Sequence, residues 1–395
     1  MYSKEMFELG SNRSVIRELF EFGKQRALEI GKENVYDFSI GNPNVPAPDC
    51  IKDSIIELLG TMDEAELHGY TSAQGDGEVR KILAEDINKR FDAEFTADNI
   101  YMTVGAAASL TICFKALTER DDEFISIAPY FPEYKVFCEG AGAKFRVVPA
   151  DTDNFEINFD ELEKTLNAHT KGIIINSPNN PSGKVYSEQT IIKLSKLLEQ
   201  KQKEYNHPIF ILADEPYREI VYNGITVPFI PKYYDNTLVC YSYSKSLSLP
   251  GERIGYIAVN PGAADASELY LAICGAGRAL GYVCASSMFQ RVVAKCVGKT
   301  SNVDYYKQNR DLFYNSLSSF GYECVSPDGA FYLFVKAMEN DANAFCERAK
   351  KYNILIVPAD GFGCPGYVRI SYCVKKEQIE ASLNAFKSLA EEYKK

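Results

Sequence analysis

From residue 76 to residue 259, short apolar runs alternate with stretches of helical periodicity, and this alternation limits the folds open to the chain more than any other feature. Short β-branched or apolar strands joined by helices imply a mainly parallel sheet that is buried on both faces. The expected strands are residues 100–104, 123–127, 144–148, 172–176, 208–213, 238–241 and 256–259, and the expected helices among them include 76–91, 106–117, 134–139 and 187–204.

The two ends of the chain have a different pattern. A single hydrophobic core usually stops growing at about 250–300 residues, so a chain of 395 residues is expected to form two domains. We expect a large α/β domain over residues 48–290 and a smaller α+β domain built from residues 1–47 and 291–395. Outside residues 76–259 we expect helices at 14–31, 263–298, 302–319 and 375–393, and strands at 36–40, 330–335 and 367–372.

Charge and composition exclude several classes of partner. The formal net charge of −11 argues against nucleic acid, because neutralising phosphates requires a basic face. No secretory signal and no apolar stretch of membrane-spanning length is present. The eleven cysteines form no Cys-x-x-Cys pair and the three histidines have no metal-ligand spacing. We therefore expect buried free thiols in a reducing cytoplasm, and no metal site.

Four loops that follow predicted strands contain the chemically interesting residues. In open parallel sheets, ligands bind beyond the carboxyl ends of the strands. Residues 103–109 are small and lead into a helix, 176–183 form a polar turn, Asp214 ends an apolar run, and Lys245 lies in a hydroxyl-rich loop eight residues before Arg253. Taken singly, each feature has a simpler explanation. Residues 103–109 fit close packing of a strand and a helix, and 176–183 fit a turn. Asp214 fits a helix cap, and Lys245 fits a surface lysine.

Taken together, the four loops resemble the class I/II aminotransferases, a family of pyridoxal-phosphate enzymes of fold type I (aspartate aminotransferase-like). The resemblance extends over nearly the whole chain. It implies a seven-stranded, mainly parallel sheet in a large domain that binds pyridoxal 5′-phosphate, and a homodimer with shared active sites. Further matching motifs are Gly41-Asn42-Pro43, Tyr70 with Gly75 and Arg80, Pro129-Tyr130-Phe131-Pro132, Gly329-Ala330-Phe331-Tyr332 and Val368-Arg369-Ile370-Ser371.

The resemblance assigns catalytic roles to residues of these loops. It implies that Lys245 joins the cofactor aldehyde and later shuttles a proton, and that Asp214 pairs with the pyridine nitrogen. Tyr217 and Asn180 would hydrogen-bond the cofactor's phenolic oxygen. Phe131 would stack on its ring, where many relatives carry Trp; this chain has no Trp, and Phe keeps the stacking but lacks the N–H donor.

The resemblance also implies a phosphate site and a substrate site. Arg369 would grip the substrate α-carboxylate in a two-pronged fork, and Gly41 would let the N-terminal segment close over the substrate. Ala106 and Ala107 stand where Gly or Ser often occurs, but their contacts are expected to come from the backbone. The expected phosphate ligands are Gly105, Ala106, Ala107, Ser242, Ser244 and Arg253, with Tyr70 from the partner subunit.

Two other signals carry less weight. The run from Gly361 to Gly366 matches the dinucleotide pattern G-x-G-x-x-G, but Pro365 lies within it and a strand, rather than a helix, is expected to follow. Arg278 lies among small residues of a predicted helix. It fits either an interface ion pair or recognition of a substrate side-chain carboxylate.

The expected activity is therefore a cytoplasmic aminotransferase that works by ping-pong half-reactions. Aspartate with 2-oxoglutarate is the first candidate substrate pair, from family frequency, followed by aromatic amino acids and alanine. The alternative on the same scaffold is a carbon–sulfur β-lyase. A third candidate, a non-catalytic regulator with a DNA-binding module, is disfavoured because only about forty residues of mixed charge precede Gly41.

Overall fold

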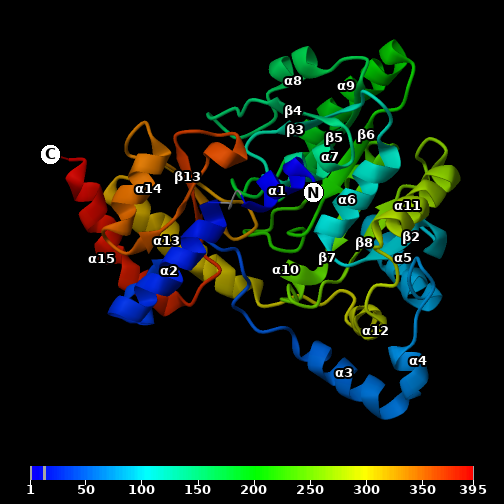
Figure 1. Cartoon of the computed structure of the whole chain (residues 1–395), viewed down its shortest axis with the longest axis horizontal. Coiled ribbons are helices and arrows are strands. Elements are labelled where there is room, and N and C mark those ends of the chain that lie inside the picture. The colour runs from blue at the N-terminus through cyan, green and yellow to red at the C-terminus, as the bar shows by residue number, and fades with distance from the viewer. Residues whose placement is uncertain (1, 12–14, 395) are drawn as a thin grey trace.

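The computed structural model describes residues 2–11 and 15–394, and its largest element is a seven-stranded sheet (Figure 1). Six of its strands run in one direction, and β8 is antiparallel to both of its neighbours, β2 and β7. The predicted mainly parallel sheet is thus confirmed. The strand order is β2 (Ile100–Thr103), β8 (Gly255–Val259), β7 (Thr237–Ser242), β6 (Phe210–Asp214), β5 (Thr170–Asn176), β3 (Glu123–Ile127) and β4 (Lys144–Val148).

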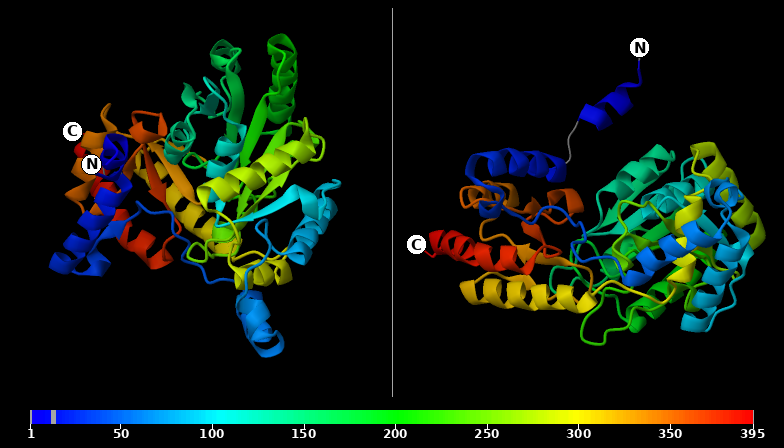
Figure 2. Two further views of the ribbon diagram at one scale, coloured as in Figure 1. Left: turned by 45° about the vertical axis from the view of Figure 1, so that its right-hand side comes forward. Right: turned by 90° about the horizontal axis from the view of Figure 1, so that it is seen from below.

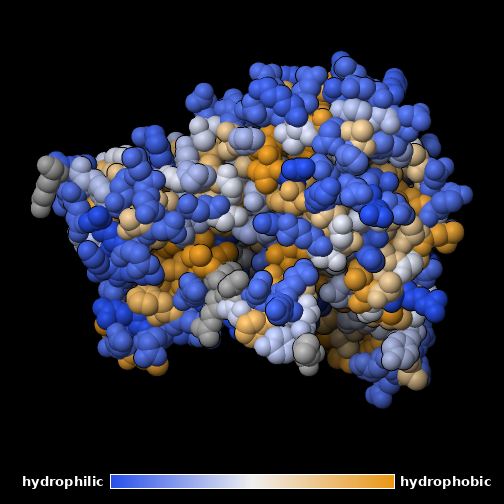
Figure 3. Space-filling model, turned by 45° about the horizontal axis from the view of Figure 1, so that its top comes forward, coloured by the Kyte–Doolittle hydropathy of each residue, from blue (hydrophilic) through white to orange (hydrophobic). Residues whose placement is uncertain are grey.

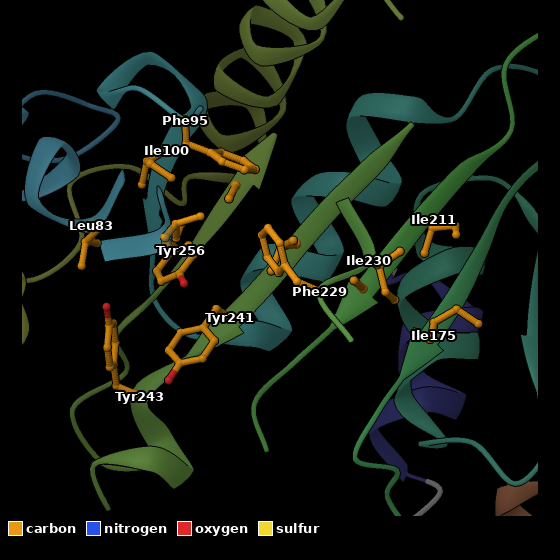
Figure 4. Packing of buried hydrophobic residues seen from close by; sticks show 14 of the residues in the cluster. Leu83, Phe95, Ile100, Ile175, Ile211, Phe229, Ile230, Tyr241, Tyr243 and Tyr256 are labelled. Carbon is orange, nitrogen blue, oxygen red and sulfur yellow. The ribbon is translucent and has the colours of Figure 1, made fainter. Parts of the chain in front are cut away.

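Helices cover both faces of this sheet. Successive residues of a strand point to opposite faces, so Ile211 and Ala213 of β6 join one apolar core while Leu212 between them joins the other. Figure 4 shows part of the first core, in which Phe229 also stacks on Phe91 with ring centroids 4.1 Å apart. That core is closed by α3 (Asp49–Thr61), α4 (Glu64–His68), α5 (Gly77–Phe91), α8 (Phe159–Thr165), α9 (Glu188–Tyr205) and α12 (Ser287–Lys295); the second is closed by α6 (Ala106–Leu117), α7 (Glu133–Gly140) and α11 (Ala266–Leu280).

The two chain ends meet in a second layered region, at the left of Figure 1 and in both views of Figure 2. Its core includes Phe38, Phe313 and Phe386, whose ring centroids lie 4.9 to 5.9 Å apart. The region contains a four-stranded antiparallel sheet in the order β12 (Val357–Pro358), β13 (Tyr367–Ser371), β10 (Tyr332–Lys336) and β9 (Cys324–Val325), the parallel pair β1 (Tyr36–Asp37) and β11 (Ile354–Leu355), and helices α2 (Val15–Ile30), α13 (Val303–Phe320), α14 (Ala342–Lys350) and α15 (Lys376–Glu392).

The single helix expected over residues 263–298 is wrong. Helix α11 ends at Leu280, because Gly281 adopts a left-handed conformation with φ of 76°. Helix α12 starts only after Ser286, whose side chain accepts a hydrogen bond from the Phe289 amide. Apolar residues recur at helical spacing on both sides of Gly281, so the sequence pattern gives no sign of this break. The domain boundary predicted at residue 290 falls inside α12 and remains a prediction, as does the boundary at residue 47.

Other differences separate the expected elements from the observed ones. Helices α3 and α14 and the two-residue strands β9, β11 and β12 have no expected counterpart. Strand β1 is shorter than the run 36–40, and β10 starts at Tyr332 because Ala330 before it has φ of 56°. Residue 14, where the first helix was expected to begin, lies outside the described residues. Among the residues described, no helix is long and apolar enough to cross a membrane. Figure 3 shows one face, which is largely hydrophilic with hydrophobic patches between the polar areas.

Candidate active site

A cavity of about 300 Å³ lies where the carboxyl ends of β5, β6 and β7 meet the start of α6 and the middle of β13. This is the place where open parallel sheets bind their ligands. All but two of the fourteen predicted site residues line it, although they come from distant parts of the sequence. They are Gly41, Ala106, Ala107, Phe131, Asn180, Asp214, Tyr217, Ser242, Ser244, Lys245, Arg253 and Arg369.

Lys245 lies on α10 (Tyr243–Ser246), a single helical turn that follows β7 directly. Its Nζ donates a hydrogen bond of 2.8 Å to the carbonyl of Gly41. The pKa of this amine is lowered to about 8, chiefly by burial; the Cys373 thiol opposes the shift, and the Arg369 and Arg253 charges add to it. A lysine with a lowered pKa is partly neutral near physiological pH, and a neutral amine is a nucleophile.

Asp214 ends β6 next to Asn176 at the end of β5. The Tyr134 hydroxyl donates to Asp214 Oδ2 at 2.5 Å, and the Asn176 side chain donates to the Asp214 carbonyl at 2.9 Å. Burial raises the pKa of the carboxyl to about 7 against the effect of the Tyr134 hydrogen bond. Within the described chain Oδ1 is buried without a hydrogen-bond partner, so Asp214 can accept a bond from a ligand.

Arg369 lies at the middle of β13 and is buried. Its Nη1 donates to Asn180 Oδ1 at 3.2 Å and its Nη2 donates to the Ser39 carbonyl at 2.6 Å. The guanidinium lies 4.7 Å from the ring centre of Tyr332 and 5.0 Å from that of Phe362. These two rings and the two hydrogen bonds hold the guanidinium in place, and a guanidinium held in this way is suited to binding a carboxylate.

Backbone and hydroxyl donors gather near Arg253. Helix α6 begins at Ala106, and the amides of its first turn have no partner inside the helix. The hydroxyls of Ser242 and Ser244 lie 2.8 Å apart. Gly105 caps α6 with φ of 99° and does not line the cavity, but a Cβ on it would lie 2.8 Å from Arg253 Nη2. A helix N-terminus, two hydroxyls and an arginine form an anion site.

The remaining predicted residues differ in position. Tyr217 Oη lies 2.9 Å from Tyr332 Oη, and a Cβ on Gly41 would lie 2.0 Å from that same Tyr332 oxygen, so Gly41 allows the N-terminal segment to approach. Tyr70 is 97% exposed and lies outside the cavity of its own chain, as does the exposed Arg278. The role expected for Tyr70 requires a second copy of the chain and stays a prediction.

Several residues that line the cavity, and Tyr134 which contacts the cavity residue Asp214, have no role assigned from the sequence. The sequence pattern assigns Asn176 only to the start of a turn. Asn176 also ends β5 beside Asp214, which ends β6, and a polar residue at the end of a buried strand is a signal for a site residue. Tyr134 follows the matched Phe131 motif by two residues, but its contact with Asp214 spans 80 positions of the sequence and has no local signal. Tyr332 belongs to a matched motif without an assigned role, and Ile16 and Ile40 line the cavity without any distinguishing pattern.

A lysine nucleophile, a buried carboxylate, an anion site and a stacked arginine in one cavity on this fold define a class of enzyme. The family model described as "Aminotransferase class I and II" matches residues 33–386. The chain belongs to this family of aminotransferases.

The chain is similar over nearly its whole length to known relatives, some of them with solved structures. A probable aspartate aminotransferase of Methanocaldococcus jannaschii is 30% identical, covering 96% of this chain and 97% of the relative. A crystal structure of an amino transferase from Eubacterium rectale is 64% identical with a TM-score of 0.98, covering 100% of both chains. The aspartate aminotransferase of Thermotoga maritima, also solved, is 27% identical with a TM-score of 0.85, covering 98% of this chain and 99% of that one.

Proposed function

We propose that this protein is a pyridoxal-phosphate-dependent aminotransferase, which exchanges an amino group between an L-amino acid and a 2-oxo acid by ping-pong half-reactions. One observation carries the proposal: the buried Lys245 amine shares a cavity with an Asp214 carboxylate oxygen that has no hydrogen-bond partner in the described chain. A Schiff-base lysine and an acceptor for a protonated ring nitrogen are the two groups that this chemistry needs most.

The residues present fit the cofactor. Asp214 Oδ1 would accept the hydrogen bond of the ring nitrogen, and Phe131 would stack on the ring. The first amides of α6, the hydroxyls of Ser242 and Ser244, and Arg253 would hold the phosphate. Tyr217 and Asn180 would contact the phenolic oxygen. When bound, the cofactor supplies an electron sink that makes the hydrogen on the substrate Cα acidic.

The chain's own residues would then hold the substrate and move its proton. Arg369 would bind the α-carboxylate, because Asn180, Ser39 and two aromatic rings fix its orientation. Lys245 would take the Cα proton as a neutral amine, which its lowered pKa favours. Gly41, whose carbonyl holds Nζ at 2.8 Å in this structure, would release it when substrate enters.

Aspartate with 2-oxoglutarate remains the first substrate pair that we propose, because several relatives are named aspartate aminotransferases. Aromatic amino acids come next, since a Thermococcus litoralis relative is named an aromatic-amino-acid aminotransferase, and alanine follows. We further propose a cytoplasmic homodimer. Tyr70 is 97% exposed in one chain, and a contact with the phosphate site of a partner subunit would explain so exposed an aromatic ring.

The test is a spectrophotometric screen of single amino acids against the cofactor-loaded enzyme without an acceptor. A donor should change the cofactor spectrum once per active site and then stop, and adding 2-oxoglutarate should restart turnover. Continuous release of product without any acceptor would instead identify a lyase. Lys245→Ala should abolish turnover, and a variant that transaminates normally would overturn the assignment of Lys245.

A further inference from the structure

A second cavity, of about 130 Å³, lies on the far side of the turn that carries Lys245. The side chains of β7 and α10 alternate between the two cavities: Ser242, Ser244 and Lys245 line the active site, while Tyr241 and Tyr243 line the second cavity. Tyr256 of β8 completes a group of three rings, which Figure 4 shows close together beside Leu83. We call this space the tyrosine cavity; none of its lining residues lines the active site.

Two of the three phenol groups make no hydrogen bond with the residues that the structure describes. Tyr241 donates to Glu219 at 2.8 Å and contacts the Ser246 hydroxyl at 2.9 Å. Tyr243 and Tyr256 are only 6% and 7% exposed, yet their hydroxyls have no hydrogen bond to any residue of 2–11 or 15–394. Burial raises the pKa of both phenols, so both hydroxyls keep their protons. Both residues line the cavity, so their hydroxyls are available to an occupant.

Charged groups of both signs line the same cavity. Arg90 lies 3.3 Å from Asp86 Oδ2 and 2.8 Å from Glu219 Oε1, while Asp86 Oδ1 has no hydrogen bond within the described part of the chain. Lys299, on the exposed loop after α12, has no ion pair among the described residues. Two cations and two carboxylates give the site no net charge, which disfavours an occupant with a net charge of either sign.

We propose that the tyrosine cavity binds a small zwitterion, namely an α-amino acid with a short side chain. Its ammonium group would contact the Asp86 carboxylate, and its carboxylate would accept hydrogen bonds from Tyr243, Tyr256 and Lys299. The volume of about 130 Å³ is well below the roughly 300–1,000 Å³ of pockets for drug-sized ligands, so only a short side chain fits.

An occupant of this cavity would contact the turn that carries Lys245. Tyr243 is the first residue of α10, and Ser246, its last residue, accepts a hydrogen bond of 2.7 Å from the Ser301 amide. The loop before Ser301 supplies Lys299. A bound amino acid would therefore hold the loop and α10 together without entering the active site.

The experiment is equilibrium dialysis of the cofactor-loaded protein with labelled glycine, which measures stoichiometry independently of turnover. The wild-type protein should bind two molecules per chain, one in each cavity. The double variant Tyr243→Phe/Tyr256→Phe keeps the rings and should retain only the active-site molecule. Arg369→Gln should retain only the tyrosine-cavity molecule. Each lost phenol hydroxyl should weaken the second site about three- to tenfold.

Matched variants separate this result from a folding defect. Tyr233→Phe removes a phenol hydroxyl that bonds Glu188 outside the cavity and should still bind two molecules. Lys299→Ala changes an exposed side chain and should weaken only the second site. Binding in the wild type that Arg369→Gln abolishes completely, or unchanged binding in both the tyrosine and the lysine variants, would each overturn the proposal. A failure of transamination alone would leave this site unaffected.

Discussion

Replacing Tyr134 with Phe should raise the pH at which the enzyme becomes active. The Tyr134 hydroxyl donates at 2.5 Å to Asp214, and both residues are buried. The change keeps the ring but removes a hydrogen bond to the ionised form of the carboxyl. Asp214 already has its pKa raised to about 7 by burial, and the hydrogen bond from Tyr134 works against that rise. Without it, the pKa of Asp214 should rise further.

The size of the shift follows from the type of bond. A hydrogen bond to a charged group contributes about 1.5–3 kcal/mol, and one pKa unit corresponds to about 1.4 kcal/mol. The acidic limb of kcat/KM should therefore move upward by about one to two units, and the rate at pH 7 should fall about five- to fiftyfold.

The assay is the pH profile of kcat/KM, together with the pH titration of the bound cofactor's absorbance. Tyr130→Phe is the matched control. The phenol of Tyr130, a near neighbour of Tyr134 in the sequence, packs against Phe145 and makes no hydrogen bond to the described residues. If Tyr134→Phe folds normally and both its acidic limb and its absorbance titration coincide with those of the wild type, the role given to Tyr134 is wrong.

Three further changes have defined outcomes. Arg369→Lys loses the two-pronged, stacked recognition of carboxylate and should lower kcat/KM for amino acids about 10- to 100-fold, mainly through KM, as initial rates will show. Gly105→Ala places a Cβ 2.8 Å from Arg253 Nη2 on backbone with φ of 99°, and should weaken cofactor retention on dialysis. The folded Asp214 carboxyl, with its pKa near 7, binds more protons between about pH 4 and pH 7 than the unfolded one. The apoprotein should therefore lose stability as pH rises through that window, and Asp214→Asn should flatten this slope in denaturant titrations.

Local patterns predicted the central sheet well. The bounds of α6, β3 and β4 agree to the residue with the expected ones, because turn signals flank each of them. The break at Gly281 could not be read in this way, since apolar periodicity continues on both sides of it. The antiparallel direction of β8 likewise depends on how the chain returns to the sheet, which no local pattern records.

In the candidate site too, some residues have a local sequence signal, whereas other contacts depend on tertiary packing. The strand-end residues Asp214 and Lys245 were found because polar groups after buried strands stand out, and the ordered motifs linked them to Arg369. Contacts that depend on tertiary packing, such as the Tyr134 hydroxyl on Asp214, have no sequence signal. The place of Tyr70 depends on a second chain, so one sequence and one structure leave it a prediction.

The most direct test of the central claim is to find the residue that the cofactor joins. The protein is loaded with pyridoxal phosphate, reduced with borohydride so that the link between aldehyde and amine becomes permanent, digested, and examined by mass spectrometry. We predict one pyridoxyl group per chain, on the peptide that contains Lys245, and none in Lys245→Ala. Labelling of another lysine, or equal labelling of Lys245→Ala, would contradict the account.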